Sequence, residues 1–417
     1  MPTEPSATVG ARPRARRDRA RLAAATCALA LAWAGGGVAH PRPAELPAVA
    51  QVPPDPNRID DRDHVLDGVY AKLAELRRAP HGQVTVFHLG DSHVQAGFFA
   101  DVMRAEFSRA FGDAGHGLVM PRVRARVRSS RGRVTTRLLT LDEPRAVADL
   151  EFRVTLADDD PSEGFDRLTF VHEKGPANLD FVVTDEAHRV LADVPSLAAM
   201  PSTGVTTVSL PGTCRAVLVK TSRSAQTQKF AQLYGISLER QTPGVRVDSF
   251  GIVGATAETM VRSPALSTLL SAVRPDLVIV SLGTNDATAR PFRDEVFSAQ
   301  VADLVARVRG ACPRAAVLLT TPPDSFLRAT RRTRAAPNPA VVEVRRVLIE
   351  SAATLRCASW DLFDVMGGSG AIGAWRDEGL ARGDLIHFTK PGYEWQAHRF
   401  FAAFYDSFTR YAGNRPG

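Results

Sequence analysis

The clearest pattern of hydrophobic and polar positions in this chain is a short apolar run that ends at a polar turn. Residues 84–89 read Val-Thr-Val-Phe-His-Leu, mostly β-branched and aromatic side chains, and such runs are typical of buried strands. The run stops at Gly90, and apolar residues recur at helical spacing over residues 98–111. We therefore expect Ser92 on a tight turn at the carboxyl end of a strand, where open α/β sheets place their ligands. Taken alone, Asp91 and Ser92 could instead only cap the next helix.

The second half of the chain alternates between apolar runs and helical patterns. The runs are short and are closed by glycine or polar residues, as is typical of strands buried on both faces. Strands that alternate with helices indicate a mostly parallel sheet covered by helices on both faces. Besides the first strand, we expect strands over residues 245–254, 276–282, 315–321 and 358–363, and helices over 67–78, 98–111, 257–273, 297–308, 340–355 and 393–411.

Residues 122–241 follow a different pattern, with a period of two. The stretch from Leu150 to Leu156 alternates strictly between apolar and polar side chains, which is the period of a half-buried strand. Similar short runs follow, separated by clusters of Pro, Gly, Asp and Ser, without a long helical pattern. This predicts an all-β, sandwich-like module, inserted into an α/β domain that it divides into residues 61–121 and 242–417.

The basic N-terminus carries most of the net charge. Six arginines but only two acidic residues precede residue 40, so this segment supplies +4 of the formal +7 and leaves +3 for the rest. A nucleic-acid partner therefore loses its main support. The arginines precede an uncharged apolar run over residues 22–34 and then small residues. This order predicts a signal peptide over residues 1–39 and a linker over 40–60, hence export to the periplasm or cell envelope. The alternative is an uncleaved segment that anchors the protein to the membrane.

Three cysteines remain in the exported part of the chain: Cys214, Cys312 and Cys357. An odd number does not make a disulfide framework. Cys312 and Cys357 each precede an apolar run, so these two thiols could lie at one sheet edge and pair, or stay apart in the core.

Four short stretches lie at the ends of the expected elements: Gly90-Asp91-Ser92-His93, Gly251-Ile252-Val253-Gly254, Gly283-Thr284-Asn285-Asp286 and Asp384-Leu385-Ile386-His387. With these residue types in this order, the chain resembles the SGNH superfamily, also called GDSL-type hydrolases. The resemblance covers residues 84–120 and 245–411 and implies a three-layer α/β/α, flavodoxin-like core. It also implies catalytic residues Ser92, Asp384 and His387, and an oxyanion hole formed by Ser92, Gly254 and Asn285.

The chemistry of these residues supports the same roles. Serine is a poor nucleophile until a neighbouring base takes its proton, which His387 can do. Asp384 lies three residues earlier and can hold the other ring nitrogen of that histidine. The backbone N–H groups of Ser92 and Gly254 and the Asn285 amide could donate to a developing oxyanion. Taken alone, Gly254 could be only a turn glycine, and Asn285 a helix cap.

Two other groups of side chains have a bearing on the site. His88, His93 and His116 lie near the serine in sequence, but they lack the spacing and the cysteine partners of zinc sites. We therefore expect neither a metal nor another cofactor. Trp375 precedes Asp384 and could either join the core or line the substrate cleft.

The fold alone does not choose among ester substrates. An exported chain with a β-module between the serine and glycine motifs resembles the bacterial periplasmic peptidoglycan O-acetylesterases, whose inserted β-sandwich looks like a carbohydrate-binding module. The resemblance implies a serine esterase that removes O-acetyl groups from a cell-wall glycan, foremost peptidoglycan, through an acyl-serine intermediate. The alternatives are an O-acyltransferase, a lipase or a thioesterase on the same core, or a catalytically inactive protein that binds the cell wall.

Overall fold

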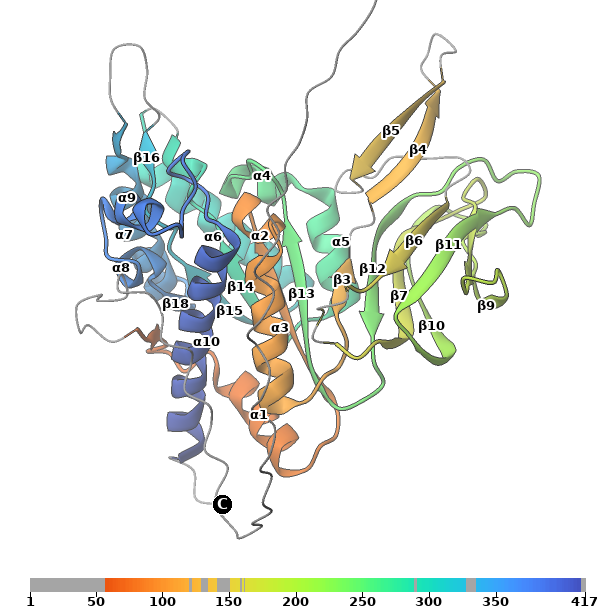
Figure 1. Cartoon of the computed structure of the whole chain (residues 1–417), viewed down its shortest axis with the longest axis horizontal. Coiled ribbons are helices and arrows are strands. Elements are labelled where there is room, and N and C mark those ends of the chain that lie inside the picture. The colour runs from red at the N-terminus through yellow and green to blue at the C-terminus, as the bar shows by residue number, and fades with distance from the viewer. Residues whose placement is uncertain are drawn as a thin grey trace, which may run out of the picture. The chain divides into compact units, whose positions relative to one another are not determined.

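The computed structural model describes residues 57–413, apart from 120–121, 129–133, 141–150, 158–159, 161, 289–290 and 328–334. The expected signal segment and most of the expected linker therefore lie outside the described residues. Within the described part, a six-stranded sheet has the order β1-β18-β15-β14-β2-β13 (Figure 1). All of its pairings are parallel except that of β1 with β18. The strands are β1 Ile59–Asp60, β2 Gln83–Gly90, β13 Gly244–Gly251, β14 Leu277–Ser281, β15 Ala316–Thr320 and β18 Ala358–Trp360.

The order of the parallel strands fixes where the site can be. In chain order, β2 is the first of them, and it lies between the second, β13, and the third, β14. This is the 2-1-3-4-5 order of flavodoxin-like sheets, in which ligands bind where the winding reverses, outside the carboxyl ends of the first and third strands. The predicted fold class is therefore confirmed, and the residues that follow β2, β13 and β14 meet at one edge.

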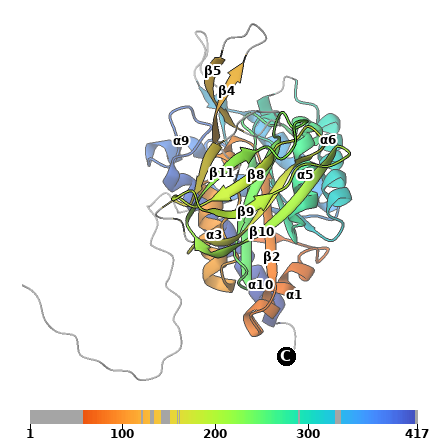
Figure 2. The same ribbon diagram turned by 90° about the vertical axis from the view of Figure 1, so that its right-hand side faces the viewer.

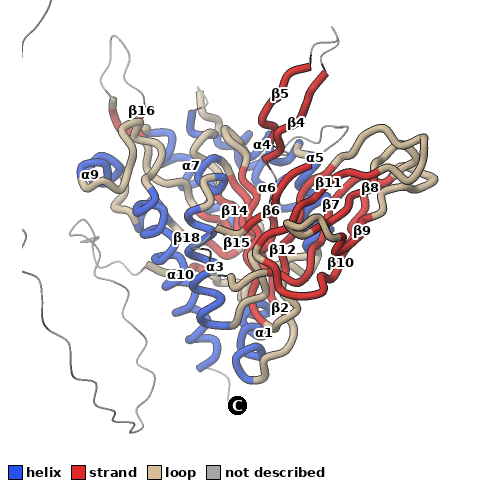
Figure 3. Tube along the Cα trace, turned by 45° about the vertical axis from the view of Figure 1, so that its right-hand side comes forward, coloured by secondary structure: helices blue, strands red, loops and turns tan. Residues whose placement is uncertain are grey.

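Helices cover both faces of this sheet, and this explains why β2 carries apolar residues on both of its faces. Val84 and Val86 face a core shared with α1 Asp67–Arg78, α3 Phe98–Phe111 and α10 Lys390–Gly413. Phe87 and Leu89 face the opposite core. Successive side chains of a strand point to opposite faces, so a strand between two helical layers needs apolar residues on both. Among the helices that contribute to the second core are α4 Ala257–Arg262, α5 Pro264–Val273, α6 Asp294–Ala311 and α7 Pro339–Thr354 (Figure 3).

The inserted module consists of two four-stranded sheets with an apolar core of its own (Figure 2). Their orders are β10-β7-β12-β3 and β6-β11-β8-β9. Strand β3, Gly117–Val119, pairs with β12, so the module's sheet begins ahead of residue 122. The other strands are β6 Glu151–Thr155, β7 Phe165–Lys174, β8 Asp180–Thr184, β9 Val190–Val194, β10 Ser202–Cys214, β11 Ala216–Ser222 and β12 Leu233–Glu239, and a separate hairpin joins β4 Arg122–Arg128 to β5 Val134–Thr140.

Buried charges join the module to the α/β core. Arg246 on β13 lies 3.1 Å from Glu239 on β12 and 3.1 Å from Asp248, and all three side chains are buried. Glu239 also pairs with Arg167 of the module at 2.7 Å, and Asp248 accepts the Leu118 N–H at 2.6 Å. Removing one partner from a buried ion pair is costly because the other charge stays behind. The module is therefore an integral part of the structure, held firmly against β13.

Two of the differences from the sequence expectations have a clear local cause. The helix expected over residues 257–273 is divided between α4 and α5, because Pro264 disfavours helical geometry at Ser263, whose ψ is 117°. The strand expected over residues 358–363 ends at Trp360. There Asp361 accepts the Asp364 N–H and begins the short helix α8, Leu362–Val365.

The remaining open expectations concern cysteines, a tryptophan and the membrane. All three described cysteines are free, and the buried Cys312 thiol donates to the Leu270 carbonyl at 3.2 Å. Trp375 lies in α9, Ala371–Asp377, and its buried ring packs against Trp395, so it belongs to the core rather than to a cleft. Of the helices in the described part of the chain, none is long and apolar enough to cross a membrane.

Candidate active site

Ser92 begins a short helix directly after β2. Gly90 ends the strand where a Cβ atom would lie 2.4 Å from the Ser281 carbonyl oxygen, so only glycine fits. Asp91 then accepts the His93 backbone N–H at 2.9 Å and caps the four-residue helix α2, Ser92–Gln95. The cap predicted for Asp91 therefore exists, and its effect is to fix the backbone that carries Ser92.

His387 and Asp384 share the loop before α10. One oxygen of Asp384 accepts the backbone N–H groups of Ile386 and His387, both at 3.0 Å, and the other lies 2.8 Å from Nδ1 of the His387 ring. Partial burial raises the pKa of Asp384, but the hydrogen bonds from His387 and Ile386 outweigh it and hold the pKa below its ordinary value. Asp384 therefore stays a carboxylate and orients the imidazole ring.

The other nitrogen of this ring meets the serine. Nε2 of His387 lies 3.0 Å from Oγ of Ser92, although 295 residues separate the two in the chain. Ser92, His387 and Asp384 thus form one hydrogen-bonded series, and each is partly exposed to solvent. The structure brings together the three residues that the sequence singled out for catalysis.

Asn285 connects the other two strand ends to this series. Its side-chain nitrogen donates to the Ala255 carbonyl at 2.9 Å and lies 3.3 Å from a carboxylate oxygen of Asp91. It therefore bridges the residue before Ser92 and the residue after Gly254. The Asn285 side chain does not act as the helix cap that the sequence offered as an alternative. The 3-10 turn that follows, η2 Asp286–Thr288, is bonded instead to the Asn285 backbone carbonyl, which accepts the Thr288 N–H at 3.0 Å.

Two backbone N–H groups complete the predicted set of donors. Within the described residues, the N–H groups of Ser92 and Gly254 have no hydrogen-bond partner in the protein. Gly254 has a φ of 76°, and a Cβ atom there would meet nothing within 4 Å. Glycine is therefore needed at this position for its left-handed backbone, and not for lack of space.

The carboxyl groups of Asp91 and Asp286 beside the site are buried, which the sequence did not indicate. Burial raises the pKa of Asp91 to about 7 and that of Asp286 to about 6. Asp286 accepts the Ala257 N–H at 3.0 Å with one oxygen, while the other oxygen is buried without a partner among the described residues. The sequence signal for Asp286 was its place directly after Asn285.

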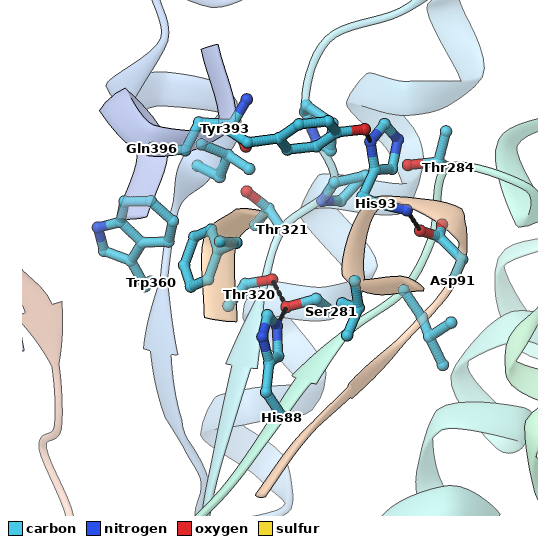
Figure 4. A pocket seen from close by; sticks show the side chains of 16 residues that line it. His88, Asp91, His93, Ser281, Thr284, Thr320, Thr321, Trp360, Tyr393 and Gln396 are labelled. Carbon is cyan, nitrogen blue, oxygen red and sulfur yellow. Dashed lines mark hydrogen bonds between the residues drawn. The ribbon is translucent and has the colours of Figure 1, made fainter. Parts of the chain in front are cut away.

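His93 also lies closer to the site than its sequence suggested. Nδ1 of His93 lies 3.0 Å from the Tyr393 hydroxyl, and its ring centroid lies 5.3 Å from that of His387. Burial, together with the neighbouring His387, lowers the pKa of His93 to about 3, so its ring stays neutral. Figure 4 shows His93, Tyr393 and Gln396 at one end of a small cavity of about 30 Å³, with His88 at the other.

The three histidines near the serine do not point to a common centre. His93 faces Tyr393, His88 lies 2.8 Å from the Ser281 hydroxyl, and His116 lies 2.6 Å from Asp160. In the part of the chain that the structure describes, no three His, Cys, Asp or Glu side chains are grouped so as to hold a metal ion.

Comparisons with known proteins agree with this geometry. The model of the GDSL-like lipase/acylhydrolase family matches residues 219–395, a range that includes Gly254, Asn285, Asp384 and His387. Among curated protein sequences, none matches the chain significantly.

Solved structures extend the comparison to as much as 82% of this chain. A peptidoglycan O-acetylesterase shares the fold with a TM-score of 0.61 and 20% identity, over 82% of this chain and 96% of that chain. An acetyl xylan esterase, AlAXEase, has 17% identity over 38% of this chain and 80% of its own, with a TM-score of 0.30. A family two carbohydrate esterase from Clostridium thermocellum has 13% identity over 70% and 99%, with a TM-score of 0.31. Over residues 219–395 the chain is thus similar to the GDSL-like lipase/acylhydrolase family, and its flavodoxin-like sheet with the inserted module has the fold of a peptidoglycan O-acetylesterase.

Proposed function

We propose that this protein is an exported serine esterase that removes O-acetyl groups from a cell-wall glycan, foremost peptidoglycan. The observation that carries the proposal is the extent of the likeness to a peptidoglycan O-acetylesterase. It covers 82% of this chain, more than the two α/β segments alone can supply, so it includes the β-module. The basic and apolar N-terminus supports export.

The arrangement of Ser92, His387 and Asp384 suits transfer of an acyl group to serine. As Oγ of Ser92 attacks the ester carbonyl, Nε2 of His387, 3.0 Å away, takes the serine proton. Collapse of the tetrahedral intermediate breaks the bond to the sugar oxygen, which receives that proton from His387. Water then repeats the sequence on the acetyl-serine, which releases acetate and restores the serine.

The surrounding donors suit the charge that develops in each tetrahedral intermediate. The free N–H groups of Ser92 and Gly254 and the amide of Asn285 come from three neighbouring strand ends. Asn285 is held in place by the Ala255 carbonyl at 2.9 Å, whereas its contact with Asp91 is longer, at 3.3 Å. The hydrogen on the Asp91 side can therefore be shared with an oxyanion, and donors fixed in advance stabilise such charge strongly.

Acetate release from O-acetylated peptidoglycan tests this function. The purified protein should release acetate from this polymer and also hydrolyse a small aryl acetate. Two controls are peptidoglycan whose acetyl groups have been removed by mild base and the Ser92→Ala variant, neither of which should give acetate. Normal turnover of the aryl acetate without any release of acetate from peptidoglycan would support an esterase activity but reject peptidoglycan as its substrate.

A further inference from the structure

A groove of about 410 Å³ lies between the α/β core and the β-module. The first turns of α3 and α10 form one wall, where Phe98, Val102 and Glu394 line it. The module forms the other wall with Val119 on β3 and Leu156 just after β6. These are edge strands of the module's two sheets, so the groove follows the seam between module and core.

A series of side-chain contacts connects the groove to the site around Ser92. Phe98, which lines it, has its ring centroid 6.0 Å from that of Tyr393. The Tyr393 hydroxyl contacts His93, whose ring lies against His387. Lys390 and Glu394, also in the lining, follow His387 on the first turns of α10. A long substrate with its ester at Ser92 could therefore extend into this groove.

The lining suits a neutral ligand with many hydroxyl groups. Apolar side chains alternate with three carboxylates, and each carboxylate already has a partner: Asp101 with Arg104 at 2.6 Å, Asp160 with His116 at 2.6 Å, and Glu394 with Lys390 at 3.9 Å. A paired carboxylate keeps lone pairs that can accept bonds from hydroxyls. It does not need a cationic ligand to offset its charge. Sugar rings offer this combination of C–H faces and hydroxyls, whereas an acyl chain has no donor for the remaining lone pairs of these carboxylates.

Both walls are held in place before any ligand arrives. The Arg246 side chain, buried between Glu239 and Asp248, joins the module to β13. Arg104 on α3 donates to the backbone carbonyls of His116 and Val247 as well as to Asp101. A groove with fixed walls costs little entropy to fill, because few groups have to be ordered on binding.

We propose that this groove binds the sugar units next to the acetylated unit, so that the enzyme acts on a glycan strand rather than on an isolated sugar. The inference rests on the proposed function and goes beyond it by assigning a binding site for the strand. Binding energy gained away from the reacting ester can then be used in the transition state. The enzyme should therefore prefer long acetylated strands to short fragments.

The test compares two substrates with the same ester. One is soluble O-acetylated glycan strands, and the other is the O-acetylated disaccharide unit obtained from them with a muramidase. If the groove binds the strand, kcat/KM per acetyl group should be at least about tenfold higher on strands than on the disaccharide unit. A change of this size is typical when one good binding contact is lost. Ala105→Trp on α3 and Ala157→Trp after β6 each place a large ring in the groove from opposite walls, and each should bring this ratio close to one.

A matched control and the possible outcomes make the test decisive. Ala187 is exposed in the turn between β8 and β9, at the far edge of its sheet from β6, and Ala187→Trp should keep the ratio of the wild type. Equal kcat/KM of the wild type on strands and disaccharide units, or an unchanged ratio in both groove variants, would overturn the groove while leaving the proposed function intact. No acetate release by the wild type from either substrate, with aryl acetate still hydrolysed, would overturn both.

Discussion

The Tyr393 hydroxyl lies 3.0 Å from Nδ1 of His93, on the side of the site where the His93 ring lies against His387. Burial raises the pKa of Tyr393 to about 12 and lowers that of His93 to about 3. Both side chains therefore stay neutral between these two pKa values, and they form a hydrogen bond beside the His387 imidazole.

Removing this bond should cost stability in a way that depends on both partners. Tyr393→Phe leaves Nδ1 of the half-buried His93 unpaired, and we expect a loss of about 1–3 kcal/mol in the free energy of unfolding. His93→Phe in the same chain removes the unpaired group, so the double variant should lose less than the sum of the single losses. Denaturant unfolding of the four proteins measures this. Strictly additive losses would mean that the bond contributes nothing.

Ser92→Ala and His387→Ala should each lower kcat on an aryl acetate by at least about 10⁴-fold, because nucleophile and base act as a unit. For the same reason, the double variant should be scarcely slower than either single one. Steady-state kinetics on the three variants, with thermal unfolding to confirm that each is folded, checks this. Near-normal turnover by Ser92→Ala would reject the serine mechanism.

Asn285→Ala should act mainly on kcat. Its amide donates to charge that exists only in the transition state, so we expect kcat to fall about 10²–10³-fold with little change in KM. Thr288→Ala is a suitable control, because the Thr288 hydroxyl donates to the Asn285 backbone carbonyl in the same turn. A similar loss of kcat in this control would assign the effect to the shape of the turn and not to the donor.

Asp286 should make stability depend on pH in a defined window. Burial, with Asp91 nearby, raises its pKa from 3.8 to about 6. The folded state therefore holds a proton that the unfolded state has already released, and the stability that this group contributes below about pH 4 is lost as the pH rises to about 6. In Asp286→Asn this loss disappears.

The measurable quantity is the difference in unfolding free energy between Asp286→Asn and the wild type. It should change in favour of the variant by about 3 kcal/mol between pH 4 and pH 7, since one pKa unit corresponds to about 1.4 kcal/mol. The unpaired amide of the variant changes its unfolding free energy by the same amount at every pH. The result is therefore the pH dependence of the difference, and not its absolute size. A difference that does not vary with pH would show that Asp286 is not protonated in the folded state at pH 5.

Much of the fold could be predicted from local patterns. The helices 67–78 and 98–111 have the bounds that their periodicity indicated, because their apolar faces pack on the sheet. The strand before Ser92 was recognisable because both of its faces are buried. Pro264 marked the break between α4 and α5 in the sequence, but the apolar periodicity runs through it and suggested one helix.

The contacts among Ser92, His387 and Asp384 could be predicted from the sequence, whereas the contacts of the side chains around them could not. Ser92, Asp384 and His387 belong to motifs, whereas the contact of His93 with Tyr393 joins residues 300 positions apart and leaves no local pattern. Likewise, nothing in the sequence indicates that the Asn285 amide faces Ala255. Such contacts depend on which loops the sheet order brings together, and that order follows from packing over the whole chain.

The buried Arg246 between Glu239 and Asp248 has a consequence for how the molecule comes apart. Opening the seam would break the buried Arg246–Glu239 ion pair and the hydrogen bond from the Leu118 N–H to Asp248, so we expect that neither half loses its structure while the other keeps its own. Heating should therefore give one cooperative transition for module and core together, in contrast to the two separate transitions of domains joined by a mere tether. We therefore expect the module and the core to fold and unfold as one unit.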